Sequence, residues 1–347
     1  MKSSDFERGI NFAAVRAAVD SGLVWLQTDP VRGMRNLLDL GSYFARTHCQ
    51  SEFFQTARRL LGSRRSQYMR LVERALTGVD LDVLKTLGIN LGYFSWSLGA
   101  RAISELEAAF DVFVPWSFMF RLDSAQLNAL KSHEIRTALE QARRLGAHSF
   151  WFNVRGSRDY VAMLLQLFGA FKDCAFMLML NGTQLTRELT QLARAQLNTM
   201  ICIDQSSARD DHATAMLREA RLLFGLSLTY DDSNANTALD GTLLETVERR
   251  GGHFALLLRG AQCTECCWRK VHKYALDSRM SPARPAFMVD VFDDMAQVDR
   301  NISSRACFVE IGPDGSVANR PWSQTGRLSL RRSSLWDILN DLTSGSK

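Results

Sequence analysis

The feature that most constrains the fold is an alternation, from about residue 112 onward, of short apolar runs and amphipathic segments. Near-continuous apolar runs of this length are typical of parallel strands buried on both faces, and the amphipathic segments are typical of the helices that cover them. We therefore predict an α/β fold, a full or partial βα-barrel of the TIM type with about six strand–helix units. The predicted pairs are 114–120 with 133–145, 148–154 with 160–171, 175–180 with 185–195, 199–204 with 213–223, 226–230 with 239–249, and 253–259 with 266–276.

The chain on either side of these units has a different pattern. Up to about residue 105, apolar residues at three- and four-residue spacing predict helices, one of which begins at Pro30. After the sixth unit, the Pro-Asp-Gly sequence at 313–315 predicts a hairpin turn, and 335–342 predict a final helix. The expected organisation is a helical N-terminal region over 1–105, the barrel over 106–290, and a C-terminal extension of hairpin and helix over 291–347.

Composition narrows the class of protein. Apolar residues make up 46% of the chain and charged residues 23%, as in a well-packed globular protein. No stretch approaches the roughly 20 apolar residues of a membrane span, and the first residues lack the apolar core of a secretory signal. We therefore expect a cytoplasmic protein with no membrane association. The net charge of +5 is modest and basic residues alternate with acidic ones, so a nucleic-acid partner is not expected.

Seven cysteines in a chain without a visible export signal favour reduced thiols over a disulfide framework. Cys263, Cys266 and Cys267 are close enough in sequence to share chemistry. Their spacing supplies two corners of a zinc or iron–sulfur site, which needs about four ligands. We expect thiols at a helix start, one of them made reactive by the helix N-terminus, and no metal. The alternative is zinc at these cysteines, joined by His253 or His272 if the fold brings them near.

Polar residues stand at the ends of the predicted strands. In a βα-barrel the chemistry lies where strands end and loops begin, so these residues are candidates for lining a cleft. A ring of mixed charge can hold a polar small molecule or a peptide, or it can be a self-neutralising cap on an empty barrel. The candidates are Arg121, Asp123, Asn153, Arg155, Asn181, Asp204, Tyr230, Asp231, Asp232 and Arg259.

Several segments, taken in order and spacing, resemble the radical S-adenosylmethionine (radical SAM) family. The resemblance is to members with a helical N-terminal region and a SPASM- or twitch-like C-terminal extension for auxiliary clusters. It implies that the turn formed by Arg155, Gly156 and Ser157 stands where the family has a glycine-rich turn against the methionine end of the cofactor. The segments are DPVRGMRNLLDLG, VPWSFMFRLDS, FNVRGS, LMLNGTQLT, ICIDQSSARDDHA and FVEIGPDGSV.

The chain departs from this family where the family binds its cluster. A radical enzyme holds a four-iron cluster through a CxxxCxxC loop after the first barrel strand. The corresponding residues 123–128 are Asp, Ser, Ala, Gln, Leu and Asn, and no cysteine occurs between Cys49 and Cys174. Arg155 and Ser157 also replace a glycine and an acid of the family's turn. The resemblance therefore implies a degenerate radical-SAM-like protein without an iron–sulfur cluster.

Three functions remain open, in this order of preference. The first is a non-catalytic pseudoenzyme whose cleft binds a peptide, a metabolite or a partner enzyme, as an accessory or scaffold beside an active enzyme of a biosynthetic pathway. The second is an enzyme with non-radical chemistry, using the aspartates and arginines at the strand ends. The third is cluster-free binding of S-adenosylmethionine, against which the altered turn at Arg155 argues. No hydrolase elbow, P-loop, dinucleotide fingerprint or HExxH motif is present, and the sequence indicates neither catalytic residues nor an oligomeric state.

Overall fold

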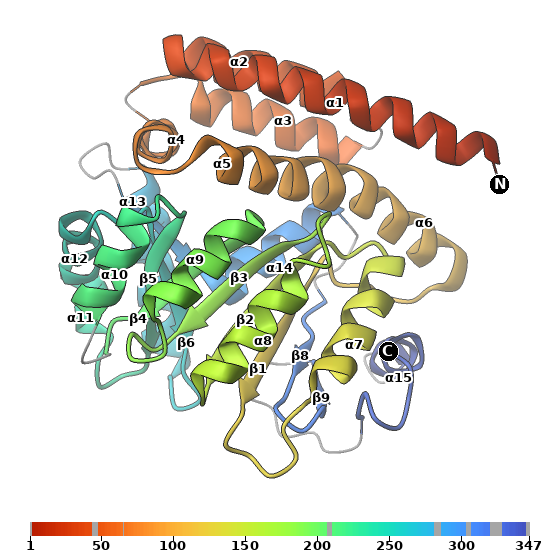
Figure 1. The fold of residues 1–347 in the computed structure, drawn as a ribbon, viewed down its shortest axis with the longest axis vertical. Helices are drawn as coiled ribbons and strands as arrows, with labels where there is room; N and C mark the ends of the chain where they lie inside the picture. The colour runs from red at the N-terminus through yellow and green to blue at the C-terminus, as the bar shows by residue number, and fades with distance from the viewer. Residues whose placement is uncertain are drawn as a thin grey trace.

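The computed structural model describes residues 2–43, 48–64, 66–206, 210–280, 286–302, 307–319 and 328–344, with the backbone alone over 2–11 and 48–50. Across these ranges one sheet forms the centre of the molecule, and helices pack along it (Figure 1). A further layer of N-terminal helices crosses the top of the sheet in this view. Among the described residues, none of the helices combines the length and hydropathy needed to cross a lipid bilayer.

Seven strands, counted over the described ranges, are parallel and adjacent in sequence order. A short hairpin extends the sheet beside the first strand: β8 pairs in parallel with β1, and β9 is antiparallel to β8. The strand order is β7-β6-β5-β4-β3-β2-β1-β8-β9. The sheet is therefore a partial barrel, and the predicted fold class is confirmed. The strands are β1 (Ser117–Asp123), β2 (Ser149–Arg155), β3 (Ala175–Leu180), β4 (Thr199–Asp204), β5 (Phe224–Tyr230), β6 (Phe254–Arg259), β7 (Phe287–Asp290), β8 (Glu310–Ile311) and β9 (Val317–Ala318).

The helices between the strands follow the predicted three- and four-residue spacing. Side-chain oxygens cap some of them: for example, Ser157 accepts a hydrogen bond from the Tyr160 N–H, and Thr186 accepts one from the Leu189 N–H. These helices are α7 (Ser132–Arg144), α8 (Arg158–Phe168), α9 (Arg187–Gln196), α10 (Asp210–Glu219), α11 (Asn236–Leu239), α12 (Thr242–Arg250) and α13 (Glu265–Met280).

One strand was missing from the sequence prediction. β7 has four residues and runs directly into helix α14 (Val291–Ile302) without a loop. A strand this short, fused to a helix, leaves no separate apolar run to recognise. Within the described residues, seven parallel strands thus follow one another in sequence order, not six, and the short β8 adds a further parallel strand beside β1. The first strand also extends past its predicted end to include Arg121 and Asp123.

The two faces of the sheet build two different cores. The outer face packs against the surrounding helices through stacked aromatic rings; Phe120 and Phe152, for example, lie 4.5 Å apart with planes 2° from parallel. The inner face is rich in sulfur and is filled by α14 through Phe292 and Met295. The other buried members of the inner core are Met119, Met177, Met179, Cys202, Phe254, Leu256, Leu258 and Val291.

The N-terminal helices cover the amino ends of the strands. Asn90 donates hydrogen bonds to the carbonyls of Lys172 and Cys174, just before β3, at 3.0 and 2.7 Å. Gly99 approaches the Gly146 carbonyl so closely that a Cβ would lie 2.2 Å from its oxygen. The layer therefore leaves the carboxyl ends of the strands uncovered (Figure 1). It comprises α1 (Lys2–Thr28), α2 (Pro30–Tyr43), α3 (His48–Leu61), α4 (Gln67–Gly78), α5 (Leu81–Gly88), the π-helix η1 (Ile89–Gly99) and α6 (Ala100–Phe110).

The C-terminal elements pack beside β1 and α7. The hairpin turn at Gly312–Gly315 is closed by the Gly315 N–H donating to the Gly312 carbonyl, which confirms the predicted turn. Helix α15 (Leu335–Ser344) lies beside α7, where the Leu335 N–H donates to Gln141 Oε1 at 2.6 Å. The C-terminal hairpin and helix expected from the sequence are both present.

Candidate functional site

Side-chain alternation places five predicted site residues on the inner face of the sheet. β1 and β2 are paired so that Arg121 lies opposite Asn153 and Asp123 opposite Arg155. These positions alternate with buried outer-face residues and share their face with Met119 of the inner core. The five residues are Arg121, Asp123, Asn153, Arg155 and Asp204.

A cavity of 430 Å³ opens at the carboxyl ends of β2 to β6, and we call it the carboxyl-edge cavity. Its volume lies within the range of about 300–1,000 Å³ that is usual for ligand sites. Met179 and Leu258 contribute apolar surface from the inner core. The structure brings five predicted residues together in its wall: Asn153, Arg155, Gly156, Asn181 and Asp204. The other polar lining residues were not predicted from the sequence; they are Thr183, Gln184, Ser206, Ser227 and Thr229.

A short turn closed by an Asp or Asn side chain follows four of the strands. In each turn the side-chain oxygen accepts the N–H two residues further along, so these residues shape the loops as well as the edge of the sheet. The pairs are Asp123 with Ala125, Asn181 with Thr183, Asp204 with Ser206, and Asp231 with Ser233.

The two carboxylates that follow β5 do not suit proton transfer. Hydrogen bonds from Ser233 lower the pKa of Asp231 below its usual range, and hydrogen bonds from Thr264 do the same to the pKa of Asp232. A general acid or base near neutral pH requires the opposite shift. Acid–base chemistry at Asp231 and Asp232 is therefore not favoured.

Arg121 is directed toward the C-terminal hairpin. Its Nε and Nη2 lie 2.9 and 2.8 Å from Oε1 of Glu310, a buried residue of β8. Arg121 was predicted to line a cleft, but it is not among the residues of the carboxyl-edge cavity. The pairing of β1 with β8 brings the two charges together and accounts for its position.

The turn after β2 joins the β1 loop to helix α8. Gly156 has φ of +113°, and a Cβ there would lie 1.9 Å from Ser124 Oγ. The same hydroxyl accepts the Ser157 N–H at 2.9 Å, and the Ser157 side chain caps α8. Gln184 Nε2 donates to the Gly156 carbonyl at 3.2 Å. The glycine is thus required by the approach of Ser124, and Ser157 has a structural role in the helix cap.

Two predicted site residues lie on the other face of the sheet. Tyr230 and Arg259 are paired in register, and both point outward, toward α13. Tyr230 is fully buried, and the Arg259 guanidinium lies 5.0 Å from the centre of the Trp268 ring. Their neighbours Thr229 and Leu258 occupy the inner positions instead. The expectation that Tyr230 and Arg259 line the same cleft as Asp204 is therefore corrected.

The three cysteines that lie close together in sequence do not share one site. Cys263, Cys266 and Cys267 are free thiols at the start of α13, as expected. The ligand atoms of Cys263, Cys267 and Asp232 lie within 4.8 Å of one another, and Cys266 is exposed. Burial raises the pKa of Cys263 to about 12 and also raises that of Cys267. Activation of Cys263 or Cys267 by the helix N-terminus is therefore not favoured, because desolvation dominates.

A group of polar residues that sequence analysis missed lies at the end of β7. His272, Asp290 and Asp293 place one ligand atom each within 4.8 Å of one another. Burial and the nearby charge of Asp293 raise the pKa of Asp290, and burial together with the nearby charge of Asp290 raises that of Tyr230. In the sequence, only the Asp-Val-Phe-Asp-Asp segment at 290–294 marks this group, and β7 is too short for its pattern to place these aspartates at a strand end.

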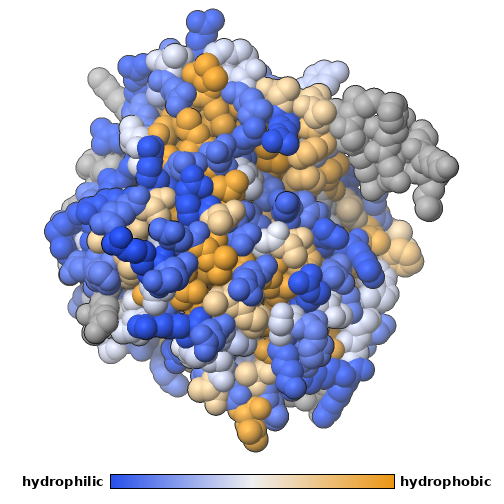
Figure 2. Space-filling model, viewed as in Figure 1, coloured by the Kyte–Doolittle hydropathy of each residue, from blue (hydrophilic) through white to orange (hydrophobic). Residues whose placement is uncertain are grey.

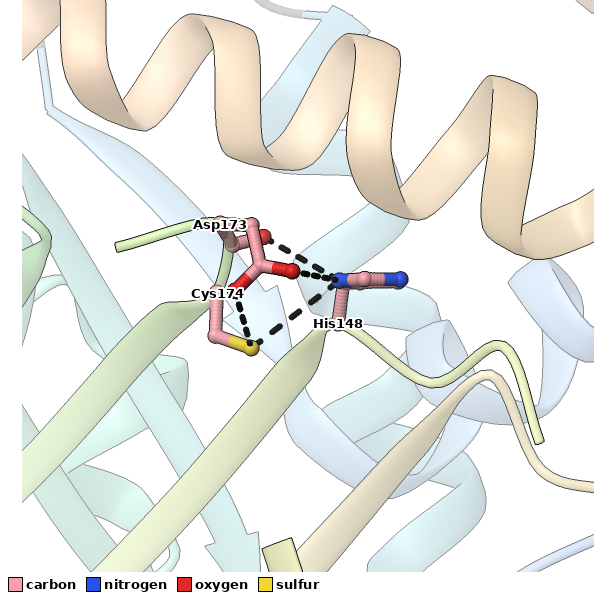
Figure 3. A group of neighbouring side chains, drawn as sticks. All are labelled: His148, Asp173 and Cys174. Carbon is pink, nitrogen blue, oxygen red and sulfur yellow. Dashed lines mark hydrogen bonds and ion pairs between the residues drawn. The ribbon is translucent and has the colours of Figure 1, made fainter. Parts of the chain in front are cut away.

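A third group, at the opposite end of the strands, superficially resembles a Cys-His-Asp triad. His148, Asp173 and Cys174 point toward one another beneath a helix of the N-terminal layer (Figure 3). The same nitrogen, His148 Nδ1, lies 3.9 Å from Cys174 Sγ and 3.6 Å from Asp173 Oδ2. In a Cys-His-Asp triad, one imidazole nitrogen faces the cysteine and the other faces the aspartate. Burial also raises the pKa of the Cys174 thiol, so this group lacks the arrangement of a nucleophile.

Comparisons with known proteins bear on the fold. No protein family matches the chain, and no curated protein matches its sequence. SuiB of Streptococcus suis bound to S-adenosylmethionine is 10% identical, with 85% of this chain and 70% of that chain covered and a TM-score of 0.52. SuiB bound to the precursor peptide SuiA is 11% identical, with 71% and 70% covered and a TM-score of 0.54. The fold is similar to that of SuiB. At such identity the likeness concerns the fold and not the chemistry.

Proposed function

We propose that this chain binds a peptide in the carboxyl-edge cavity, as a non-catalytic accessory protein of a biosynthetic pathway. The observation that carries the proposal is the cavity itself, in which hydroxyl and amide side chains surround apolar Met179 and Leu258. Such groups suit the alternating N–H, C=O and apolar groups of a peptide. Arg155 and Asp204 add one positive and one negative charge to the cavity wall. These opposite charges would fix the direction in which the peptide lies.

The fold likeness supports a peptide over other ligands. SuiB, which shares the fold, is seen with a precursor peptide bound. The carboxyl ends of the strands, where the carboxyl-edge cavity opens, are not covered by the N-terminal layer (Figure 1). The N-terminal layer therefore does not block the approach of a peptide to the cavity.

The β1 loop supports binding without radical chemistry. Residues 124–131 contain Ser, Ala, Gln, Asn, Leu and Lys and no thiol. The side chains of Asp123 and Ser124 accept hydrogen bonds from nearby backbone N–H groups. A four-iron cluster needs thiolate ligands. Such a protein would assist an active enzyme of the same pathway by holding its peptide.

The test is selection of ligands from a randomised peptide library on the purified chain, followed by calorimetry with the selected peptide. We expect the Arg155→Ala and Asp204→Asn variants to bind at least about tenfold more weakly, since each removes one charge from the cavity wall. Asn at 204 can still accept the Ser206 N–H, so the loop is preserved. Arg249→Ala, an exposed site on α12, is the matched control and should bind like the unaltered chain.

Three results would overturn the proposal. One is equal binding by the cavity variants and the control, which would place the ligand elsewhere. Another is stoichiometric iron and sulfide in the anaerobically purified chain, which would restore cluster chemistry. The last is saturable binding of S-adenosylmethionine at the cavity without peptide binding, which would favour the cofactor as ligand.

A further inference from the structure

The group at the end of β7 lies on the outer face of the sheet, apart from the carboxyl-edge cavity. Asp290 is the last residue of β7, Asp293 lies in the first turn of α14, and His272 projects from α13. Asp290 is paired with Leu257 of the outer core. Three elements thus converge on one point, independently of the residues that carry the proposed function.

The three side chains form a compact set of donors. His272 Nδ1 lies 2.9 Å from Asp290 Oδ2 and 3.8 Å from Asp293 Oδ2. One imidazole nitrogen and two carboxylate oxygens are ligands that suit Zn²⁺, Mn²⁺ and Fe²⁺. Calcium and magnesium prefer oxygen donors alone. The set therefore matches a divalent transition metal.

Two buried polar atoms beside the set have no hydrogen-bond partner among the described residues. One is Asp290 Oδ1, on a side chain only 1% exposed, and the other is the hydroxyl of Tyr230. A hydrogen bond between His272 and Asp290 satisfies only Oδ2 and leaves Oδ1 orphaned. Burying an unpaired carboxylate oxygen is costly. A cation, with the Tyr230 hydroxyl donating to its ligand shell, would remove that cost.

Surrounding groups hold the set in position. Trp268 Nε1 donates to Asp293 Oδ2 at 2.6 Å, and the Arg259 guanidinium stacks on the Trp268 ring. Contacts of this kind orient metal ligands in advance of binding. His272 and Asp293 are 30% and 25% exposed, so one side of the group is open to solvent. That side provides an entry path and room for water ligands.

We propose that His272, Asp290 and Asp293 form a binding site for a divalent transition-metal ion, Zn²⁺ or Mn²⁺, with Tyr230 in its outer shell. The site is distinct from the neighbouring cysteine pair. There, Thr264 already donates to both oxygens of Asp232, at 2.8 and 2.6 Å.

The experiment uses the full chain, stripped with a chelator and titrated with Zn²⁺ and with Mn²⁺ by calorimetry. We expect about one equivalent to bind, and Tm to rise with metal concentration because the ion binds the folded state. Asp290→Asn and His272→Gln should each weaken binding at least about tenfold. A Cys263→Ser/Cys267→Ser double variant and His148→Gln, at the other two candidate groups, are the controls and should bind normally.

The design separates misfolding from loss of a ligand. Asp293→Asn alters a partly exposed residue and tests the same site if the Asp290 variant does not fold, and circular dichroism of each stripped protein monitors folding. The proposal is overturned if the unaltered chain binds neither metal. It is equally overturned if binding disappears in the cysteine variant and persists in Asp290→Asn, since the thiols would then be the ligands.

Discussion

Gly156 links the β1 loop to the wall of the carboxyl-edge cavity through a single backbone position. Its φ of +113° lies outside the region that L side chains adopt, and Ser124 occupies the space of a Cβ. The same hydroxyl of Ser124 accepts the Ser157 N–H at the start of α8. One small residue therefore fixes the relative placement of two loops at the edge where the ligand is proposed to bind.

Replacing Gly156 with Ala should destabilise the fold by about 1–3 kcal/mol, because of both the strained φ and the contact with Ser124. The free energy of unfolding in urea measures this change. Gly88→Ala is the matched control: nothing lies within 4 Å of its Cβ position and its backbone is helical. That control should be neutral or stabilising by about 0.5–1 kcal/mol. Equal changes in unfolding free energy at the two positions would contradict the role given to Gly156.

At the scale of elements, His253 ties the start of β6 to its neighbours. The ring is 2% exposed, its Nδ1 lies 3.2 Å from the Phe224 carbonyl oxygen, and its Nε2 faces Gly78 of α4. Burial lowers the pKa of His253 to about 4. The folded protein therefore holds this imidazole neutral at the junction of α4, β5 and β6.

This shift predicts a loss of stability in acid. Because the folded-state pKa is depressed, the unfolded chain takes up a proton at a higher pH than the folded chain. Stability from this group is present above pH ~6.5 and falls as the pH drops toward ~4, by up to about 3 kcal/mol. Urea unfolding at pH 7.5 and 4.5 measures it.

His253→Gln should reduce that pH dependence, and His212→Gln, at an exposed site, should leave it unchanged. Equal pH dependence in the unaltered chain and in His253→Gln would show that another group is responsible.

On the scale of the whole molecule, the two ends of the strands have different surroundings. The N-terminal layer packs on the amino ends through Asn90 and the close approach of Gly99 to Gly146. Figure 2 shows orange surface over the N-terminal helices at the top of the molecule, interrupted by blue. The carboxyl ends carry the polar cavity instead. The supporting layer and the proposed binding site therefore lie at opposite edges of one sheet, as in other βα-barrels.

Asn90→Ala should loosen the docking of the N-terminal layer. The change leaves the carbonyls of Lys172 and Cys174 without their side-chain donor, at a cost of about 1–3 kcal/mol. Hydrogen exchange should accelerate in η1 more than in the central strands. Asn128→Ala, on the exposed β1 loop, is the control. Uniform exchange across both regions would argue that the layer docks by other contacts.

The sequence by itself determined the alternation of strands and helices, the start of α2 at Pro30 and the C-terminal hairpin, because each follows from local periodicity or turn chemistry. It also indicated Asn153, Arg155, Gly156, Asn181 and Asp204, which converge because the carboxyl ends of parallel strands meet at one edge.

Only the tertiary structure decided which face each side chain occupies. It sent Tyr230 and Arg259 outward, paired Arg121 with Glu310, and joined His272 to Asp290 across a strand too short to recognise. Strand register and helix packing are long-range properties, and a shift of one residue moves a side chain to the opposite face.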